Sequence, residues 1–548
     1  MTSFIRFKIF KFNIVQNNLS GTFCKPLFCF LTLLLISTSI LAQNKSMNDN
    51  AKSAQQNLTA SFPNCVFYEI FIRSFCDSNN DGIGDIPGII SKLDYLHDLG
   101  IEGIWLTPFN PSPSYHKYDV TDYYNVDEEY GTLDDVRELI TEAHKRNIKV
   151  IMDFVVNHTS VQHPWFIEAQ KSKTNAYHNY YTWADENNLP GEKHWWHFLQ
   201  SNSKQIKSNE KYLGFFDRSM PDLNYDNNDV RSEIIKAGKY WLKDIGMDGF
   251  RLDAAKWIYM PGNEKKNYSW WQQFVSEMKK VKPSAFFVGE ITDKNIATAP
   301  YLKDALTSVF NFELAEKIVE TVQTYTDSGI VSLVNDSRHL FFENNPGFID
   351  ATFITNHDQD RIASFTNGDE NKTKMAAAIL LTLPGSPFIY YGEELGMTGK
   401  KPDEQIREPY LWNDDAIDAG QTSWIKAKYS VEQNVKPLSL QIIDGNSIYA
   451  YYKKLISIRN QSLALRVGDL VSSALSSDNF LVYQRAVKLN SAIVIHNLQS
   501  ELKVVDLFSI AKGKYKILFA TSSVDITGGS IIKVPPYSSV IIDVTDLK

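Results

Sequence analysis

Cysteine is scarce in this chain of 548 residues, which contains only four. Cys24 and Cys29 fall near the start, whereas Cys65 and Cys76 flank the strand-like run VFYEIFIRSF. A strand rises about 3.3 Å per residue, so its two flanking thiols would lie roughly 30 Å apart. Because a disulfide needs Cα atoms within about 7 Å, the sequence predicts no disulfide.

Positive charge is not in excess either. The chain has 56 Lys and Arg against 64 Asp and Glu, a formal net charge of −8, which argues against a nucleic-acid partner. Hydrophobic residues make up 43% and charged residues 22%, as in ordinary globular proteins, and the length suffices for two or three domains with buried cores. We expect no nucleic acid and no protein partner.

Acidic residues are missing from the first 48 positions. This segment carries several basic residues, then the apolar run PLFCFLTLLLISTSILA, then Ala42-Gln43. A basic start, an apolar stretch and a small residue at its end are the features of a secretory signal. We predict a signal peptide over residues 1–42, a flexible segment over 43–61, and export to the periplasm or the extracellular space. The run is close to the shortest that spans a membrane, so an uncleaved N-terminal anchor is the alternative.

Short apolar runs alternate with helical patterns over most of the chain. Eight runs are strand candidates: VFYEIFI, GIWLTP, KVIMDFVV, GFRLDAA, AFFVGE, SVFNFEL, ATFITNHD and PFIYYGEE. Buried strands that alternate with helices imply parallel pairing through right-handed crossovers. Eight such units over about 390 residues predict an α/β fold, a closed (β/α)8 TIM barrel. A doubly wound open sheet is the alternative on pattern alone.

Helix ends are marked by turn and capping residues. The stretches DLGIEGIWL (98–106) and DIGMDGFRL (244–252) resemble each other, and each follows an amphipathic helical pattern, the first running from Ile86 to Leu99. Gly100 and Gly246 stand where a helix ends in a left-handed residue. Thr132, with Asp135 three residues later, fits the N-cap of another helix.

Two segments depart from this alternation. Residues 158–228 are polar and aromatic, with HNYYTW and KHWWHF, and are predicted to form a subdomain inserted after strand three. From about residue 460 onward, short alternating runs recur at the regular spacing typical of an antiparallel β-sandwich. We expect a barrel over 62–460, including the insertion, and a C-terminal β-sandwich over 461–548.

Polar residues gather at the predicted carboxyl ends of the strands, where barrels of this kind carry function. In strand order they are Asn157 and His158, Arg251 and Asp253, Glu290, and His357 and Asp358. One such acid is more often part of a structural ion pair, but core packing gives no reason for four strands to end alike. Converging carboxylates without a cysteine or multi-histidine set argue against zinc and thiol chemistry. They suit cleavage of a glycosidic bond, in which one carboxylate attacks and a second donates a proton.

Four of these stretches resemble, in order, the main motifs of the α-amylase family, glycoside hydrolase family 13. They are DFVVNH (153–158), GFRLDAAKW (249–257), FFVGE (286–290) and FITNHD (353–358). MPDLN (220–224) is similar to a fifth motif, of the group intermediate between oligo-1,6-glucosidases and neopullulanases. The resemblance implies a retaining glycosidase for starch, maltodextrins or related α-glucans. It would cleave α-1,4-glucosidic bonds, with some α-1,6 cleavage left open.

The resemblance also implies roles for individual residues. Asp253 would be the nucleophile, Glu290 the general acid/base, and Asp358 the residue that holds sugar hydroxyls and stabilises the transition state. Arg251 would bind at the same site and keep Asp253 ionised. The remaining substrate-binding residues would be Tyr118, Asp119, His158, His357 and Arg407.

The stretch DSNNDGIGD (77–85) begins like an EF-hand calcium loop, but Gly88 stands where the bidentate Glu belongs. Four oxygen-bearing side chains so close together repel each other unless a hard cation neutralises them. A solvated turn is the alternative. The resemblance implies a structural Ca²⁺ here, distant from the bond being cleaved. Its ligands would be Asp77, Asn79, Asp81, the Ile83 carbonyl and Asp85.

Two other functions remain open at the level of the sequence. Transglycosylases of the same family differ in excluding water from the acceptor side, which the sequence does not reveal. A barrel that has lost catalysis, serving as a carbohydrate-binding or transporter-associated subunit, is the alternative of another class. Inactive relatives usually lack one of the three acids, whereas Asp253, Glu290 and Asp358 are all present. Ala254, directly after Asp253, is small, whereas similar enzymes confined to α-1,6 bonds often have Val there, so the resemblance favours α-1,4 cleavage.

Overall fold

The computed structural model describes residues 62–199, 209–413, 420–431 and 433–545. The predicted signal peptide over 1–42 and the predicted flexible segment over 43–61 lie outside these residues. None of the helices within the described ranges is long and apolar enough to cross a membrane.

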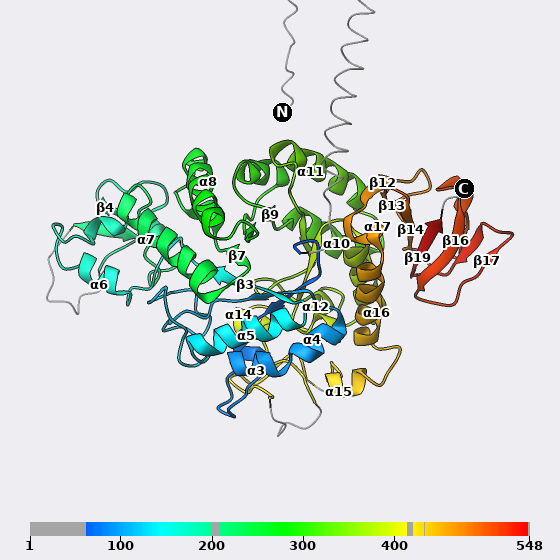
Figure 1. The fold of residues 1–548 in the computed structure, drawn as a ribbon, viewed down its shortest axis with the longest axis horizontal. Helices are drawn as coiled ribbons and strands as arrows, with labels where there is room; N and C mark the ends of the chain where they lie inside the picture. The colour runs from blue at the N-terminus through cyan, green and yellow to red at the C-terminus, as the bar shows by residue number, and fades with distance from the viewer. Residues whose placement is uncertain (1–61, 200–208, 414–419, 432, 546–548) are drawn as a thin grey trace, which may run out of the picture. The chain divides into compact units, whose positions relative to one another are not determined.

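Eight parallel strands form the central sheet, in the order β10-β11-β1-β2-β3-β7-β8-β9. Their bounds are β1 Phe67–Ile70, β2 Gly103–Leu106, β3 Lys149–Phe154, β7 Gly249–Leu252, β8 Phe286–Gly289, β9 Ser308–Val309, β10 Ala351–Phe353 and β11 Ser386–Tyr390. A parallel bridge between Phe310 and Ala351 joins the end of β9 to β10. The sheet thus returns on itself, which confirms the predicted (β/α)8 barrel and excludes the open sheet (Figure 1).

The sixth strand is shorter than predicted. The run SVFNFEL forms a strand only over Ser308–Val309, and helix α10 (Phe312–Thr324) follows. Asn311 explains this difference, because its side chain accepts a hydrogen bond from the Leu314 amide at 3.1 Å and caps the helix. Chain that was predicted to extend the strand therefore begins the helix.

The helix ends that turn residues predicted are confirmed. Helix α5 (Leu133–Lys145) begins at Thr132, which forms a capping box with Asp135. Gly100 ends the helix before β2 with φ 95°, and Gly246 ends the helical turn before β7 with φ 104°. The single helix expected from Ile86 to Leu99 is instead two, α3 (Ile86–Ser91) and α4 (Leu93–Leu99).

Helices surround the barrel, and aromatic rings fill its interior. Besides α5 and α10, the longer helices are α7 Asn228–Lys239, α8 Glu264–Val281, α11 Ile330–Asn344, α13 Glu370–Thr382 and α16 Ile448–Gln461. Inside the sheet, the Phe67 ring stacks on Phe388 with centroids 4.4 Å apart and on Phe286 at 5.6 Å. The barrel is therefore a packed core, and function is confined to its rim.

An insertion after strand three is confirmed. Between β3 and β7 the chain forms helix α6 (Pro164–Ala169) and a three-stranded antiparallel sheet in the order β4-β6-β5. The strands are β4 Trp183–Asp185, β5 Trp196–His197 and β6 Glu210–Leu213. A bridge between His158 and Asp222 ties this segment, at the left of Figure 1, to the end of β3.

The C-terminal part is an antiparallel β-sandwich, as predicted. One sheet has the order β12-β13-β14-β19-β16 and the other β15-β18-β17. Their bounds are β12 Asp469–Ser472, β13 Phe480–Val487, β14 Asn490–Asn497, β15 Lys503–Asp506, β16 Lys514–Ala520, β17 Ile526–Thr527, β18 Ile531–Val534 and β19 Ser538–Thr545. Val482 and Ile495 pack in one core with Val505 and Ile532 of the other sheet. The limits 62–460, 158–228 and 461–548 stay predictions.

Both cysteines in the described part of the chain are free. Cys65 and Cys76 are buried thiols, which agrees with the prediction of no bridge. The geometry differs from the expected strand, because β1 ends at Ile70 and a short helix, α2 (Ile72–Phe75), follows.

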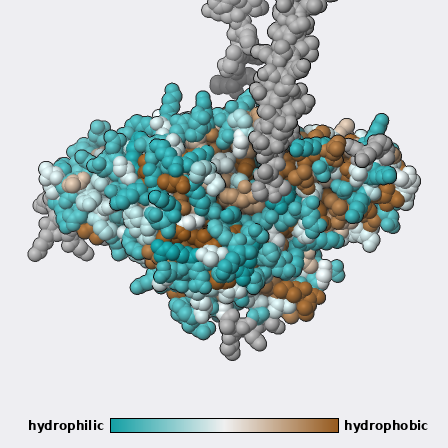
Figure 2. All heavy atoms as spheres, in the orientation of Figure 1, coloured by the Kyte–Doolittle hydropathy of each residue, from teal (hydrophilic) through white to brown (hydrophobic). Residues whose placement is uncertain are grey.

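The outer surface is mostly hydrophilic on the face in Figure 2. Apolar residues gather there around α15 (Leu438–Gln441), where Leu440, Ile442 and Ile443 are exposed. The apolar runs that predicted the strands do not contribute to this surface, because the barrel strands are buried.

Candidate active site

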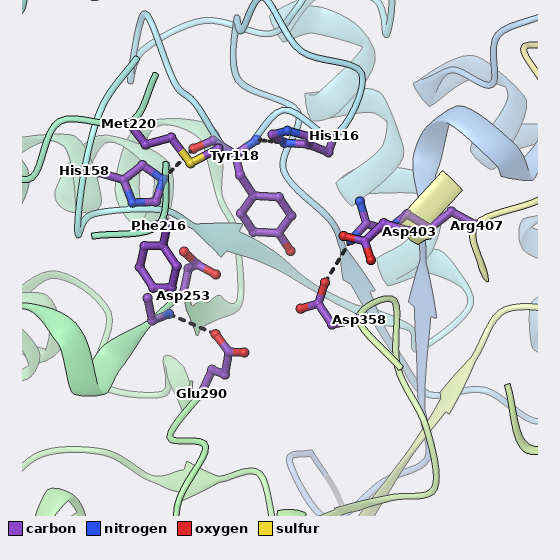
Figure 3. Close-up of a pocket in the computed structure, with 11 residues that line it drawn as sticks. His116, Tyr118, His158, Phe216, Met220, Asp253, Glu290, Asp358, Asp403 and Arg407 are labelled. Atoms are coloured by element: carbon purple, nitrogen blue, oxygen red, sulfur yellow. Dashed lines mark hydrogen bonds and ion pairs between the residues drawn. The ribbon is translucent and has the colours of Figure 1, made fainter. Parts of the chain in front are cut away.

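A cavity of about 240 Å³ lies at the carboxyl ends of the barrel strands. Asp253 directly follows β7, Glu290 directly follows β8, and Asp358 lies beyond β10. All three acids line this cavity, and Figure 3 shows them around a common space. Acids that are far apart in the sequence are thus brought together by the barrel.

Arg251, on β7, joins two of these carboxylates. Its Nη1 donates to Asp253 Oδ1 at 2.5 Å, and its Nη2 lies 2.9 Å from Glu290 Oε2. Nη1 also donates to Asp153 Oδ1 on β3 at 2.8 Å. Arg251 is only 1% exposed, so these ion pairs are shielded from water. Because a guanidinium is planar and rigid, it holds Asp253 and Glu290 in a constant relative position.

Asp253 and Glu290 share most of their electrostatic environment. Burial raises the pKa of both Asp253 and Glu290, and the Arg251 charge opposes the shift at both. At Asp253 a hydrogen bond from Arg251 opposes it further. The negative charge of Asp358 adds to the rise in pKa at both groups, and that of Asp253 adds to it at Glu290. Both pKa values are therefore raised by burial, and at each group a hydrogen bond, from Arg251 at Asp253 and from the Ala254 N–H at Glu290, supports the ionised form.

The turn after β7 also holds Glu290. Ala254 has φ 46°, in the left-handed region that residues with a side chain rarely occupy. Its N–H donates to Glu290 Oε2 at 3.0 Å. Backbone strain of this kind persists where surrounding contacts enforce it. The strained turn supplies Glu290 with a second fixed donor in addition to Arg251.

Asp358 is held in its ionised form by two cationic neighbours. Arg407 Nη2 donates to Asp358 Oδ1 at 2.8 Å, and His357 Nε2 lies 3.2 Å from Oδ2. Burial alone would raise the pKa of Asp358, but His357 and then Arg407 hold it well below its ordinary value. Arg407 Nε also donates to the His357 carbonyl at 2.9 Å, which fixes the guanidinium. The third carboxylate is therefore a permanent negative charge across the cavity from Asp253 and Glu290.

A chain of hydrogen bonds connects the strands beneath the cavity. Tyr118 Oη donates to Asp153 Oδ2 at 2.9 Å and lies 2.6 Å from His357 Nε2. The Tyr118 and His357 rings are stacked, with centroids 5.6 Å apart. His357 Nδ1 in turn lies 2.5 Å from Glu69 Oε1 on β1. Residues from β1, β3, β7 and the loops after β2 and β10 thus fix one another.

The other predicted substrate-binding residues differ in their positions. His158 lines the cavity, and its Nε2 donates to the Tyr118 carbonyl at 3.1 Å. Burial lowers the pKa of His158 to about 4, so the ring is neutral near pH 7. Asp119 is buried away from the cavity lining, where Ser112 Oγ donates to its Oδ1 at 2.6 Å. Contact of Asp119 with a sugar stays a prediction that this arrangement does not support directly.

Comparison with known proteins identifies the family. A family model described as the α-amylase catalytic domain matches residues 69–468, which is more than half of the chain. The chain belongs to the α-amylase family. A second model, described as the C-terminal domain of the α-amylase SusG, matches residues 481–541 in the β-sandwich.

Several α-amylase-family proteins are similar over most of their length. "Alpha-amylase 3" of Dictyoglomus thermophilum is 42% identical over 492 residues, which cover 88% of this chain and 94% of that protein. A 4-α-glucanotransferase of Thermotoga neapolitana is 33% identical, covering 79% of this chain and 96% of that protein. The crystal structure of an α-amylase from H. orenii matches with a TM-score of 0.79 at 38% identity, covering 88% and 99% of the two chains. The chain is accordingly a glycosidase of the α-amylase family.

Sequence reasoning missed several residues of this α-amylase-family site. The missed residues that line the cavity are His116, Phe216, Met220 and Asp403, and those that support it are Glu69, Asp153 and Tyr115. Asp153 and Glu69 carried a usable signal, because each is an acid inside an otherwise apolar strand and so needs a buried partner. Phe216 carried none, since an aromatic residue in an insertion is equally typical of a small core.

The loop predicted to bind calcium folds back on its own amide groups. Asp77 Oδ2 accepts from the Gly82 N–H at 2.7 Å, and Asp85 Oδ1 accepts from Gly88 N–H at 2.6 Å. Gly82 has φ 91°, and a Cβ there would lie 2.7 Å from Ser423 Oγ. Asp81 and Asn79 are exposed, so the loop has both buried and solvent-exposed oxygen atoms.

Those oxygen atoms suit a hard cation. Asp77 and Asp85 are both buried, and burial followed by the charge of Asp77 raises the pKa of Asp85. Within the described ranges, no three His, Cys, Asp or Glu side chains are already grouped as a metal site. The predicted set draws on Asn79 and the Ile83 carbonyl as well, and oxygen-only donors are what Ca²⁺ prefers. The donor chemistry therefore fits the ion, whose presence stays a prediction.

Proposed function

We propose that this protein is a retaining glycosidase that hydrolyses α-1,4-glucosidic bonds in starch, maltodextrins or related α-glucans. The observation that carries the proposal is the bridge made by Arg251 between Asp253 and Glu290, with Asp358 on the same cavity. A pair of carboxyl groups at one sugar, one to attack and one to donate a proton, is what double displacement needs.

Hydrolysis of the glycosidic bond proceeds in two steps. In the first, an Asp253 oxygen bonds to the anomeric carbon while the bond to the leaving oxygen breaks, and Glu290 gives its proton to that oxygen. The product is a glycosyl ester on Asp253. In the second, Glu290 takes a proton from water, the water oxygen bonds to the anomeric carbon, and the ester bond breaks. The ionised Asp358 stabilises the oxocarbenium-like transition states by its negative charge.

Substitution of the two reacting acids tests these roles. We expect Asp253→Asn to abolish turnover, because an amide cannot form the ester. Glu290→Gln should lower kcat by roughly 10²–10⁴ for substrates that need protonation of the leaving group. Thermal unfolding should show that both variants remain folded. Near-normal turnover in either variant would contradict the assignment.

Bond preference is part of the proposal. Ala254 stands next to Asp253 where similar enzymes confined to α-1,6 bonds often have Val, which supports α-1,4 cleavage, and the Dictyoglomus relative is named an α-amylase. Soluble starch, maltotriose, pullulan and isomaltose should be incubated separately and the products resolved by chromatography. We expect release from starch and maltotriose, whereas preferential release from isomaltose would contradict α-1,4 specificity.

Transglycosylation is the second candidate, because one relative is named a 4-α-glucanotransferase. In that case a sugar hydroxyl replaces water in the second step. Maltotriose alone separates the two activities: a hydrolase gives only shorter sugars, and a transferase also gives maltotetraose and longer products. The ratio of longer products to reducing ends gained measures which acceptor prevails.

Structural calcium in the loop 77–85 is a further part of the proposal. Asp77, Asn79, Asp81, the Ile83 carbonyl and Asp85 would hold the ion, which would neutralise the acids and stiffen the loop. We expect chelation to lower the Tm and added Ca²⁺ to restore it. In an Asp77→Asn, Asp81→Asn double variant, chelator should have no further effect. An unchanged Tm of the unmodified protein in excess chelator would contradict the site.

The proposed function also includes export of the protein, which the composition of the first 42 residues supports. The signal peptide would be removed and the enzyme released to the periplasm or the extracellular space. N-terminal sequencing of the protein recovered from its native cells, after separation of membranes from soluble fractions, tests this. A start near residue 43 in the soluble fraction is expected, and an intact N-terminus in the membrane fraction would show the anchor instead.

A further inference from the structure

Glu69 is a buried acid that does not line the active-site cavity. It lies on β1, is 1% exposed, and its Oε1 is 2.5 Å from His357 Nδ1 and 3.4 Å from the His357 amide. A carboxylate removed from water is costly unless it is paired with a positive charge. The position of Glu69 therefore depends on the protonation state of His357.

Both nitrogens of His357 face acceptors. Nδ1 faces the Glu69 carboxylate, and Nε2 faces Asp358 Oδ2 at 3.2 Å and Tyr118 Oη at 2.6 Å. The Tyr118 hydroxyl donates its own proton to Asp153, so toward His357 it accepts. Only the imidazolium form has a proton on each nitrogen. The carboxylates on both sides of the ring thus favour a positively charged His357, which is completely buried.

We propose that Glu69 is a positioning residue that fixes His357 as an imidazolium and, through it, orients Tyr118 and Asp358 around the bound sugar. Without the charge of Glu69, Nε2 can lose its proton. It would then present a lone pair to Asp358 and to Tyr118. Both groups line the cavity, so their displacement would reach the substrate although Glu69 does not. The inference rests on the proposed function.

The groups that face His357 account for its charge. Glu69 comes from β1, Asp358 is the next residue along the chain, Tyr118 comes from the loop after β2, and Arg407 donates to the His357 carbonyl. The Trp105 ring on β2 packs edge-on at 5.5 Å. Burial alone would lower the pKa of His357, but Asp358 and Glu69 raise it to about 10. Of the two anions, Glu69 is the one without contact to the cavity.

Replacement of Glu69 should shift the pH dependence of activity in one direction. The His357 pKa in the native enzyme is above its ordinary value, so the imidazolium persists well above pH 7. Replacing Glu69 by Gln keeps an oxygen acceptor for Nδ1 but removes one of the two negative charges. The His357 pKa should then fall, and activity should be lost at alkaline pH while activity near pH 6 is largely kept.

The test compares pH profiles of kcat/KM for maltotriose between pH 5 and 10. In Glu69→Gln the alkaline limb should move down by about one unit or more, which is roughly a tenfold loss at the pH where the limb falls. The matched control is Asp350→Asn, a buried acid that directly precedes β10 at the opposite end of the strand from His357 and contacts Asn311. Its profile should have the shape of the unmodified enzyme.

A second measurement does not depend on activity. The His357 ring signals in an NMR titration of the unmodified enzyme, assigned by their loss in His357→Gln, should remain those of an imidazolium up to about pH 9. Titration of His357 near pH 6.5 would overturn the inference. So would a Glu69→Gln profile parallel to that of the unmodified enzyme. If the unmodified enzyme cleaves no glucan, the proposed function fails, and the same NMR titration of Glu69→Gln still decides the role of Glu69, because the His357 pKa should be lower there than in the unmodified enzyme.

Discussion

At the scale of single residues, Arg251 is the cation that pairs with three carboxylates of the site. Asp153 and Asp253 both contact its Nη1, and Glu290 contacts its Nη2. The predicted consequence of Arg251→Met is a loss of about 3–5 kcal/mol in the free energy of unfolding, because buried carboxylates are left without a counter-charge. Urea denaturation of the two proteins measures it, and kcat should fall with it.

The control for this prediction is Arg146→Met. Arg146 makes ion pairs at the surface with Asp94 and Glu142, where water screens the charges. Its removal should leave stability and activity nearly unchanged. An equal loss of stability in both variants would mean that burial of the Arg251 pairs has no special effect.

Site residues that directly follow a strand could be predicted from the sequence. Site residues that depend on contacts between distant strands could not. Asp253, Glu290 and Asp358 each follow an apolar run, so the barrel hypothesis alone placed them together. Glu69 lies inside a strand, and its partner is 288 positions away. Asp119 accepts hydrogen bonds from Ser112 and Ser114, and it is not among the residues that line the cavity. Such side-chain pairings leave no local pattern.

At the scale of elements, helix caps decide where the barrel units begin. Thr132 caps α5, and both its backbone N–H and its hydroxyl bind Asp135, at 2.8 Å and 2.7 Å. We expect Thr132→Ala to lower the free energy of unfolding by about 1 kcal/mol, since the first turn loses its cap. Thr141→Ala, in the exposed interior of the same helix, should be neutral or stabilising because alanine favours helix. Denaturation of both variants tests this, and an equal effect would contradict the capping argument.

Element types were predictable because each barrel strand is a short apolar run between turn residues. Element limits were less so. The run SVFNFEL is apolar enough for a strand of seven residues, yet the hydrogen bond from the Leu314 amide to Asn311 starts a helix within it. Likewise the apolar spacing from Ile86 to Leu99 is continuous, but the helix breaks at Lys92. Hydrogen bonds of the backbone can start or end a helix inside an apolar run, and the apolar spacing does not show where.

At the scale of the whole molecule, buried polar contacts join the β-sandwich to the barrel. Arg485 on β13 donates to the Thr382 carbonyl of α13 at 2.5 Å, and Tyr483 Oη lies 2.6 Å from Thr382 Oγ1. His496 on β14 completes the group, with Nε2 3.4 Å from Thr382 Oγ1. The sandwich is therefore fixed to the barrel by specific hydrogen bonds, and we expect the two parts to unfold together.

This interface predicts a dependence of stability on pH. Burial lowers the pKa of His496 to about 3, whereas an unfolded histidine has a pKa of about 6.5. Between these values the unfolded chain binds a proton that the native protein does not, so stability falls as pH falls from about 6.5 toward 3. His496→Gln should make this slope shallower in urea titrations from pH 4 to 7. His339→Gln, at an exposed site on α11, should leave it unchanged, and identical slopes in all three proteins would contradict the prediction.

The central claim, that Asp253 attacks the sugar and Glu290 serves it as acid and base, is tested most directly by trapping the intermediate. Glu290→Gln should react with α-glucosyl fluoride, whose leaving group needs no proton, and then stall because water is not activated. Peptide mass spectrometry should find one glucosyl unit on the peptide that contains Asp253, and none when Asp253 is also replaced by Asn. A glucosyl unit on another residue, or turnover of the fluoride to β-glucose without any adduct, would contradict the account.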